Sequence, residues 1–544
     1  MKKQTLRDYI AVHSWVGIVC GLFLFIAFYA GAFSMLDPAI TRWTQASHPQ
    51  AAVSPDADAA LDRFLAEHPD AKGRLSLRLA NDQQTAPLLK LSDSQRHESW
   101  FELGQDGVLR HLNRAQEADD TGNFVDYLHR KGGLPLPLDW AEPAIGIVSL
   151  LYALALVSGV VALLPSLVKD LFHLRLGANF KRMWLDVHNL LGVASLPFHI
   201  VIAVSAAVFG LHDWIYAAQD HFIYRDGLRA TVARESAPPP TIARADWLKP
   251  SELVVKIREQ APHFEPQILD YVGLGGKRTL LFVAGSNETH FKRGAQFGYA
   301  FVNLATGEIY DRTYLPGEQR SALGAALSSF FSLHFGSFGN DSVRVLYILL
   351  GLSGALIFYT GNILWVESRT KRLRKRPETS ALSEQTAQAA QRAWHVDILS
   401  KVTLGVCLGC AAALPATIAV ARWLAPWVDD LNGVHQATFN AVFGACVLVA
   451  IRLGNARAAA PLLWLTALCN ALVPLTAWAA HFVPAELLLP LRKPYQDGFL
   501  MLELLCLFLA VFFGWLAWRF QRVPHSSASP SPISSSLPSD AKPS

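Results

Sequence analysis

The sequence predicts an all-α polytopic membrane protein of about eight transmembrane helices, with two small α+β domains outside the bilayer. Hydrophobic residues make up 51% of the 544 residues and charged residues only 17%, whereas soluble domains carry about a quarter charged residues. The apolar residues are grouped in runs long enough to cross a hydrocarbon core, which takes about 20 helical residues. Two long polar segments interrupt these runs.

The spans are expected where the apolar runs lie, with boundaries uncertain by a few residues. The runs lie at about 12–36, 143–165, 187–211, 343–366, 400–424, 434–452, 461–482 and 498–519. The domains expected between and after them are a first polar domain (37–142), a second polar domain (212–342), a basic loop (367–399), a four-helix C-terminal region (400–519) and a disordered tail rich in Ser and Pro (520–544).

The distribution of Lys and Arg predicts the orientation. With eight spans, the basic clusters all fall on one side of the membrane, and that side is expected to be cytoplasmic. The clusters are Lys2, Lys3 and Arg7; Lys169, Arg175, Lys181 and Arg182; Arg369, Lys371, Arg372, Arg374, Lys375 and Arg376; Arg452 and Arg457; and Arg519 and Arg522. Both termini are then cytoplasmic, and both polar domains lie outside.

The two polar segments have similar patterns. In the first, a helical stretch at 61–68 precedes a strand-like run at 100–103 and a turn at 105–107. In the second, a helical stretch at 251–260 precedes strand-like runs at 280–283 and 299–302 and a turn at 305–308. A strand, a glycine turn and another strand predict a hairpin. Each segment is therefore expected to form a small α+β module.

The flanking spans repeat as well. The matching pairs are the H-x-x-x-G motifs His13 to Gly17 and His188 to Gly192, the Leu-His pairs Leu128-His129 and Leu333-His334, and the Ser-Gly pairs Ser158-Gly159 and Ser353-Gly354. They occur in the same order, so the first ~366 residues are expected to contain two copies of one unit. Repeats of this kind often place a site at their interface.

These motifs resemble a known family. The helix-and-hairpin modules, with "VNLATGEIYD" in the second, are similar to PepSY domains, and the H-x-x-x-G helices and Leu-His pairs resemble the PepSY-associated transmembrane proteins over roughly residues 5–370. The resemblance implies an iron-regulated protein of the bacterial inner membrane, and a ferric-siderophore reductase that carries b-type haem. The last four spans extend beyond the part that the resemblance covers.

Histidine is a usual axial ligand of haem iron, and ligating side chains inside a bilayer are rare and usually functional. His13 and His188 are equivalent in the repeat and are expected to bind one haem from opposite sides. The alternative is that both are interfacial histidines at helix ends.

His199 lies within the third span, 11 residues after His188. On a continuous helix both would project from one face, roughly 16 Å apart, which suits two stacked haems. The favoured partner of His199 is His334, with a His129–His334 pair as the symmetric alternative. A hydrogen bond from His199 to a neighbouring helix is also an open reading.

The first hypothesis for function is therefore an electron conduit with two haem b groups, which reduces a ferric siderophore in the periplasm to release iron. The electron donor would be a cytoplasmic flavin, a flavoprotein or a quinol, because the sequence contains no nucleotide-binding motif. The alternatives are a transporter of iron, siderophore or peptide, and a non-enzymatic PepSY module that binds or regulates a partner. Nothing in the small net charge of +4 predicts nucleic-acid binding.

Overall fold

We describe the fold from a computed structural model of the whole chain. The structure describes residues 3–44, 56–80, 87–93, 98–112, 121–166, 180–223, 242–286, 298–315, 322–374, 383–425, 427–428, 430–482 and 498–522. The predicted disordered tail (520–544) lies outside these residues from 523 onward, as does the last part of the basic run at 369–376.

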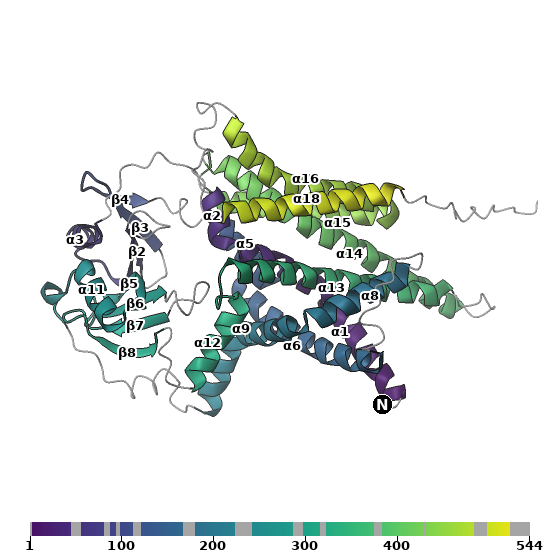
Figure 1. Cartoon of the computed structure of the whole chain (residues 1–544), viewed down its shortest axis with the longest axis horizontal. Coiled ribbons are helices and arrows are strands. Elements are labelled where there is room, and N and C mark those ends of the chain that lie inside the picture. The colour runs from purple at the N-terminus through teal and green to yellow at the C-terminus, as the bar shows by residue number, and fades with distance from the viewer. Residues whose placement is uncertain are drawn as a thin grey trace, which may run out of the picture.

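Eight of the described helices are long and apolar enough to cross a membrane. They are α1 (Lys3–Ser34), α6 (Leu138–Leu163), α9 (Leu196–Phe222), α13 (Asp341–Arg374), α14 (Ser383–Leu424), α15 (Leu431–Leu453), α16 (Asn455–Phe482) and α18 (Phe499–Arg522). Their count and order confirm the predicted fold class. In Figure 1 they form one bundle, with a separate sheet domain beyond one end. We call that end the sheet end and the opposite one the N-terminal end.

The third predicted span (187–211) differs from the structure. The helix is interrupted at Ser195, which separates α8 (Phe180–Ala194) from α9. Ser195 has φ −100° and ψ 8°, and Pro197 follows at the start of α9. Proline has no N–H to continue the helical ladder, and its ring clashes with the carbonyl of the residue four positions earlier. His188 and His199 therefore lie on two helices, and the expectation of one shared face on a continuous helix does not hold.

The described part of the sheet domain contains two α-helices and eight strands. They are α3 (Ala57–Glu67), β1 (Gly73–Arg78), β2 (Leu88–Ser92), β3 (Glu98–Leu103), β4 (Leu109–Leu112), α11 (Pro250–Gln260), β5 (Glu265–Leu274), β6 (Leu280–Ser286), β7 (Gly298–Val302) and β8 (Ile309–Tyr314). The order across the sheet is β4-β3-β2-β1-β5-β6-β7-β8, with antiparallel neighbours. The predicted helical and strand-like runs of both modules are present.

The two modules are halves of one sheet rather than two independent domains. β1 of the first pairs with β5 of the second, with Leu75 opposite Tyr271 and Leu77 opposite Leu269. All four side chains are fully buried in one hydrophobic core together with Phe64 of α3. Each module alone would leave an unpaired edge strand and part of a small core exposed. Joining β1 to β5 removes both edges.

Shorter helices connect the sheet to the bundle. They are α2 (Asp37–Thr44), α5 (Thr121–Lys131) and α12 (Ala322–Phe335), and two single turns of 3-10 helix lie at Leu164–Ser166 and Arg244–Asp246. Among the described residues, only short connections separate β4 from α5 and β8 from α12. Each half of the sheet thus leads directly into a helix at the sheet end of the bundle (Figure 1).

The last four membrane helices pack onto the first four through α14. One core cluster contains Phe25 and Phe33 of α1, Cys410 and Leu414 of α14, and Leu502 of α18. The membrane-spanning part of α14 is the most buried of the eight. The C-terminal region therefore forms a single body with the repeat.

Candidate histidine site

The structure forms two pairs of histidines, and in each pair one histidine comes from the first copy of the repeat and one from the second. His13 of α1 faces His188 of α8, with ring centroids 6.2 Å apart and ring planes at 76°. His129 of α5 faces His334 of α12, also at 6.2 Å, with planes at 47°. All four rings are half-buried. The members of each pair are equivalent in the two copies, so the internal repeat brings like residues together.

The pair at the N-terminal end is held by backbone carbonyls. The Nδ1 of His13 lies 2.8 Å from the carbonyl oxygen of Ala155. The Nδ1 of His188 lies 3.2 Å from the carbonyl oxygen of Ile357 and 3.0 Å from the Oγ1 of Thr360. A carbonyl only accepts, so each Nδ1 carries the proton and donates. In a neutral imidazole the lone pair is then on Nε2, which is the form that binds metals.

The pair at the sheet end is held in a similar way. The Nδ1 of His129 donates to the carbonyl oxygen of Ala27 at 2.7 Å. The Nδ1 of His334 lies 2.8 Å from the Oγ of Ser205, and that hydroxyl donates to the carbonyl oxygen of Val201 at 2.7 Å. The hydroxyl proton is thus already used, so Ser205 accepts from His334. Nδ1 is engaged in all four histidines.

Desolvation keeps His334 neutral. Its ring contacts Phe209 and Phe335 at centroid distances of 5.0 and 5.3 Å. Burial, and secondarily the neighbouring His129, lower the pKa of His334 to about 3. The imidazole is therefore uncharged at neutral pH, and its Nε2 lone pair is available to an electrophile.

Glycines on the neighbouring helices make room for three of these rings. A Cβ built on Gly31 would lie 2.8 Å from the Nδ1 of His129, and one on Gly159 would lie 2.9 Å from the Nδ1 and Cε1 of His13. A Cβ on Gly361 would lie 3.4 Å from the Cε1 of His188. Each glycine lies four positions after the residue whose carbonyl accepts the hydrogen bond from the histidine, so one helical turn supplies both the hydrogen bond and the space.

This arrangement changes one match in the predicted repeat. The sequence pairs Ser158-Gly159 with Ser353-Gly354, but the residues that contact the equivalent histidines are Gly159 and Gly361. Thr360 precedes Gly361 as Ser158 precedes Gly159, so the true counterpart is Thr360-Gly361. The Ser-to-Thr difference concealed this match in the sequence.

His199 lies apart from both pairs. It is 1% exposed, and its Nδ1 lies 2.6 Å from the Oη of Tyr152. Phe28, Phe198 and Tyr152 surround its ring at centroid distances of 5.5 to 6.0 Å. Its buried Nε2 has no hydrogen-bond partner among the described residues.

The structure therefore brings His334 to His129, which is the symmetric alternative, and places His199 in an aromatic cluster with Tyr152. Sequence reasoning missed Tyr152, although a tyrosine inside an apolar span is itself a signal, because a buried hydroxyl needs a partner.

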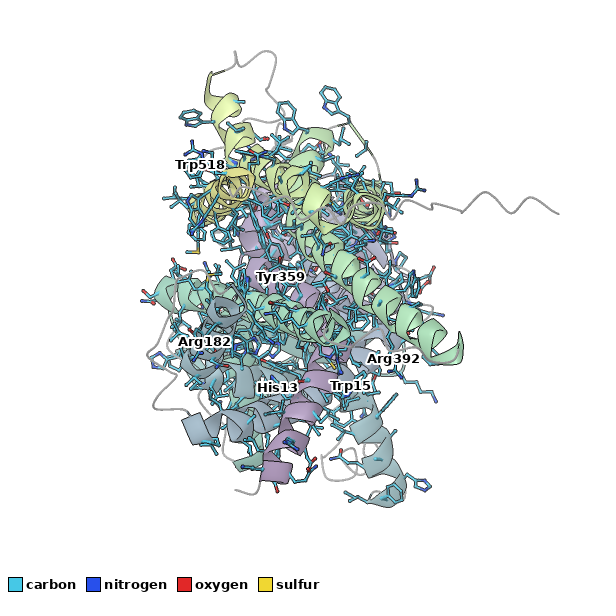
Figure 2. The ribbon with its side chains drawn as sticks, turned by 90° about the vertical axis from the view of Figure 1, so that its right-hand side faces the viewer. His13, Trp15, Arg182, Tyr359, Arg392 and Trp518 are labelled. Carbon is cyan, nitrogen blue, oxygen red and sulfur yellow. The ribbon has the colours of Figure 1, made fainter. Side chains whose placement is uncertain are left out.

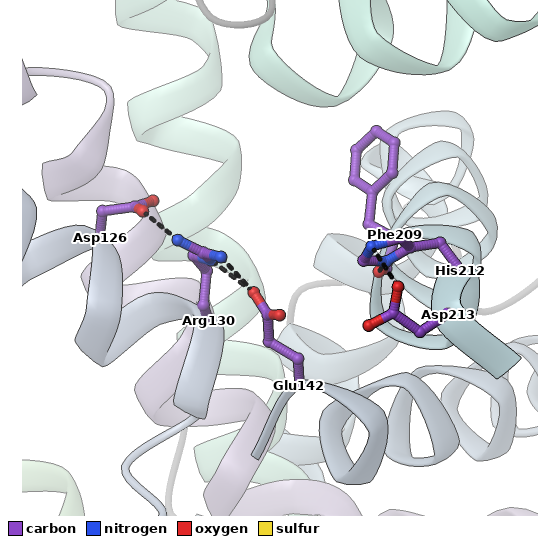
Figure 3. Close-up of polar contacts among 6 residues, drawn as sticks. All are labelled: Asp126, Arg130, Glu142, Phe209, His212 and Asp213. Atoms are coloured by element: carbon purple, nitrogen blue, oxygen red, sulfur yellow. Dashed lines mark hydrogen bonds and ion pairs between the residues drawn. The ribbon is translucent and has the colours of Figure 1, made fainter. Parts of the chain in front are cut away.

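An ion-pair cluster fixes the helix that carries His129. Arg130 follows His129 in α5, and its Nε donates to the Oε1 of Glu142 in α6 at 2.7 Å. A second guanidinium nitrogen lies 3.4 Å from the Oδ2 of Asp126. Figure 3 shows the guanidinium between the two carboxylates. Neighbouring His212 instead contacts its own helix, through the carbonyl of Phe209 and the carboxylate of Asp213.

Among the described residues no group of three or more His, Cys, Asp or Glu side chains could hold a metal ion. The chain offers pairs of imidazoles instead. A facing pair can supply two ligands, on opposite sides, to a metal whose remaining positions are filled by a flat non-protein ring. Whether the histidines bind such a group stays a prediction.

The fold and the histidine site define a class of protein: a multi-pass membrane protein whose duplicated unit pairs equivalent histidines, with an extramembrane sheet at one end. The family model of the PepSY-associated TM region matches residues 10–368. The chain therefore belongs to the PepSY-associated transmembrane family, as its motifs predicted. No curated protein matches the sequence.

Proposed function

We propose that the protein is a transmembrane electron conduit with two haem b groups, which reduces a ferric siderophore on the sheet side of the membrane. The observation that supports this most strongly is the equal spacing of the two histidine pairs, at 6.2 Å between ring centroids. If both histidines of a pair were to hold one metal through bonds of about 2 Å, with each ring centroid roughly 1 Å behind its nitrogen, the centroids would lie about 6 Å apart.

The chemistry of the surrounding residues fits such a group. Each imidazole has its Nδ1 engaged and its Nε2 lone pair left for a ligand bond. Glycines flank the pair at the N-terminal end, where a Cβ on Gly17 or Gly192 would meet no other atom within 4 Å. These are the glycines of the H-x-x-x-G motifs, one turn after His13 and His188, and they leave space for a flat ring beside each imidazole.

The two pairs lie at different depths, so an electron that crosses the membrane through them would travel in shorter steps. His13 lies on α1, and His129 binds the carbonyl of Ala27 on the same helix, 14 positions later, which is about 21 Å along the axis. The hydrocarbon core is about 30 Å thick. The cluster of Phe28, Tyr152, His199 and Phe358 lies beside the residues that hold both pairs, with ring centroids 5.1 to 6.0 Å apart. We expect these aromatic side chains to exclude water from the region between the pairs.

A bound haem would supply a one-electron carrier at each pair. The chain's own residues orient the ligands: backbone carbonyls fix the tautomer at three of the four histidines, and Arg130 anchors the helix of His129. At the sheet side, the acceptor is Fe³⁺ held by oxygen ligands. Such hard ligands hold Fe³⁺ far better than Fe²⁺, so one electron loosens the chelate and releases the iron.

The proposed orientation places the N-terminal end in the cytoplasm of a bacterial cell and the sheet in the periplasm. Figure 2 looks onto the N-terminal end, where His13 and Trp15 lie on α1 and the basic residues Arg182 and Arg392 are labelled nearby. Basic residues concentrate on the cytoplasmic side. Reporters fused near residues 80 and 270 should be active only as periplasmic markers, and one near 375 only as a cytoplasmic marker; the reverse at 375 would refute this orientation.

The electron donor would then meet the N-terminal end, as a reduced flavin, a flavoprotein or a quinol. Trp15 and Trp365 lie there with centroids 6.2 Å apart, and the guanidinium of Arg369 lies over both rings, at 5.5 and 4.8 Å. Trp15 is exposed, and a planar donor can stack on an exposed aromatic ring of this kind. Trp15 is two residues from His13, so the donor would approach the first pair.

The test is haem content and spectrum. The purified protein should show a low-spin b-type spectrum, with two haems per chain, extractable by acid-acetone because the sequence has no C-x-x-C-H attachment motif. His13→Ala and His188→Ala should each remove one haem, and His129→Ala and His334→Ala the other. His212→Ala is the matched control, because His212 contacts only its own helix among the residues shown in Figure 3. Colourless protein from haem-replete cells would refute the proposal.

A further inference from the structure

Three buried polar atoms toward the N-terminal end of the bundle have no hydrogen-bond partner among the described residues. They are the Nδ2 of Asn362 and the Nε1 of Trp365 in α13, and the Oγ1 of Thr403 in α14. Asn362 and Thr403 are each only 2% exposed. A buried polar group without a partner is costly, and native proteins usually provide one. These atoms are therefore free to bind a ligand that carries hydrogen-bonding oxygen atoms.

The three residues lie where α13 and α14 pack together as antiparallel neighbours (Figure 1). Tyr359 of α13 lies near Cys407 of α14, and both belong to one core cluster. One helical turn further toward the N-terminal end come Asn362 on α13 and Thr403 on α14. Trp365 follows Asn362 by three positions, so both side chains lie on one side of α13. The unpaired atoms are thus gathered at one level of the bundle.

Helix α1 forms the third wall of this region. A Cβ on Gly21 would lie 2.6 Å from the Oδ1 of Asn362, so α1 meets the amide at a glycine. Nearer the N-terminal end, the rings of Trp15 and Trp365 lie 6.2 Å apart, and the guanidinium of Arg369 lies over both. The two tryptophans therefore connect the buried atoms to the surface of the bundle.

The surface at Trp15 faces lipid. Trp15 is 57% exposed, and Val12 and Val19, about one turn before and after it, are 38% and 58% exposed. Large apolar side chains exposed on a membrane-spanning helix contact lipid, and tryptophan is common at the level of the headgroups. A molecule dissolved in the bilayer can therefore reach the two tryptophans from the side.

The same part of α13 holds the inner histidine pair. The Oγ1 of Thr360 lies 3.0 Å from the Nδ1 of His188, and a Cβ on Gly361 would be in contact with the His188 ring. Asn362 is the next residue after Gly361. A ligand bound by Asn362 would therefore lie about one helical turn from the residues that hold His188.

We propose that this site, between α1, α13 and α14, binds the head group of a membrane quinol as the electron donor. One oxygen of the head group would accept from the Nδ2 of Asn362 and the other from the Nε1 of Trp365. A quinol hydroxyl would donate to the Oγ1 of Thr403, and the isoprenoid tail would lie in lipid beside Trp15. The oxygens of a para-quinol are separated by about one helical turn, as are the two donors.

This names the donor class and rests on the proposed function. The quinol would give up two electrons, one at a time, to ferric haem iron at the inner pair. Its two hydroxyl protons would pass to cytoplasmic water, and the quinone would return to the bilayer. Each electron reduces one ferric chelate on the sheet side, so one quinol serves two chelates.

Binding can be measured without any electron transfer. The probe is heptyl-hydroxyquinoline N-oxide, a fluorescent quinol analogue that is not oxidised, titrated into the full-length protein in detergent. We expect its fluorescence to be quenched on binding, and an added short-chain quinone to displace it. In a second assay, decylubiquinol should reduce the haem of the wild type rapidly, whereas dithionite should reduce the wild type and every variant alike.

Variants locate the site. Asn362→Leu, Trp365→Phe and Thr403→Val each remove one hydrogen-bonding group and keep an apolar side chain of similar shape. Each should weaken binding about fivefold, the loss expected for one hydrogen bond, and the double variant Asn362→Leu/Trp365→Phe about twenty-fivefold. Trp140→Phe is the matched control, because Trp140 is an exposed tryptophan near the start of α6, at the sheet end.

Haem content and melting curves show which variants fold. If Asn362→Leu does not fold, Trp365→Phe and Thr403→Val carry the test. Haem-containing protein that neither binds the analogue nor is reduced by decylubiquinol would overturn the quinol site and leave the conduit standing. So would folded variants that bind the analogue as tightly as the wild type does. Protein without haem that binds the analogue in a manner dependent on Asn362 and Trp365 would overturn the conduit and leave the quinol site standing.

Discussion

Gly159→Ala should displace the ring of His13 without unfolding the protein. The new Cβ would lie 2.9 Å from the Nδ1 and Cε1 of His13, whereas ordinary contacts begin at 3.4 Å, so the ring must retreat by about 0.5 Å. That movement weakens the 2.8 Å hydrogen bond to Ala155, at about 1 kcal/mol. Replacing a helical glycine by alanine stabilises the helix by about 1 kcal/mol. The two effects nearly cancel in the free energy of unfolding, but the imidazole is reoriented.

Gly361→Ala is the matched control on the partner histidine. Its Cβ would lie 3.4 Å from the Cε1 of His188, which is an ordinary contact. The assay is electron paramagnetic resonance of the oxidised protein, together with a redox titration, because both respond to the orientation of an axial imidazole. Gly159→Ala should change the signal of one haem, and Gly361→Ala should leave both unchanged. Equal spectra for the two variants would refute the role assigned to Gly159.

Four further substitutions test other parts of the site. Gly17→Leu and Gly192→Leu meet no neighbouring atom within 4 Å of the new Cβ, so thermal stability should be kept while one haem per chain is lost; full haem content would argue against the proposed space. Arg130→Gln removes the ion pair with Glu142 and should cost at most about 1 kcal/mol of stability, yet shift the spectrum of the outer haem only. His435→Ala breaks the 2.9 Å contact with Thr121 of α5 and should lower the thermal stability and outer-haem retention together, measured by melting curves and haem assay.

The sequence alone predicted the membrane bundle well because its signals are local. Each span is a run of apolar residues, and the duplicated motifs lie at matching positions. The prediction of the third span as one continuous helix was wrong, because the break in that helix depends on a single proline. Pro197 ends the ladder at Ser195 and separates the helices of His188 and His199, whereas hydropathy is continuous across that point.

The union of the two sheet modules was not predictable from either module. The pairing of β1 with β5 joins residues nearly 200 positions apart, for example Leu75 and Tyr271. Each strand alternates normally in both arrangements, so the sequence pattern is the same for an edge strand and a paired one. Only the tertiary structure distinguishes them.

The members of the histidine site were predicted from the sequence, and so was one of its two pairings. Both histidines of each pair were recognised from the repeat, and His13 lies beside His188 as expected. For His334, the sequence analysis favoured His199 as the partner, with His129 as the symmetric alternative. The structure follows the symmetry: His334 faces His129. The position of His199 in the middle of a span is explained instead by its hydrogen bond with Tyr152.

The C-terminal helices touch both copies, since α14 packs against α13 of the second copy, but at the sheet end their described contacts are with α2 and α5 of the first copy. In the first copy, His435 of α15 contacts Thr121 of α5. In the same region, the Nε1 of Trp43 in α2 donates to the Oε1 of Glu503 in α18 at 3.1 Å, and the guanidinium of Arg422 lies 4.2 Å from the Trp43 ring centroid.

These contacts hold α2 and α5, and α5 carries His129. The corresponding helix of the second copy, α12, packs against α9 instead, through ring contacts of Phe209 with Phe331 and His334. Duplication provided two equivalent histidines at the sheet end, and the added helices stabilise the position of one. We therefore expect the last four spans to act on the outer pair by fixing its geometry, through the contacts of α15 with α5.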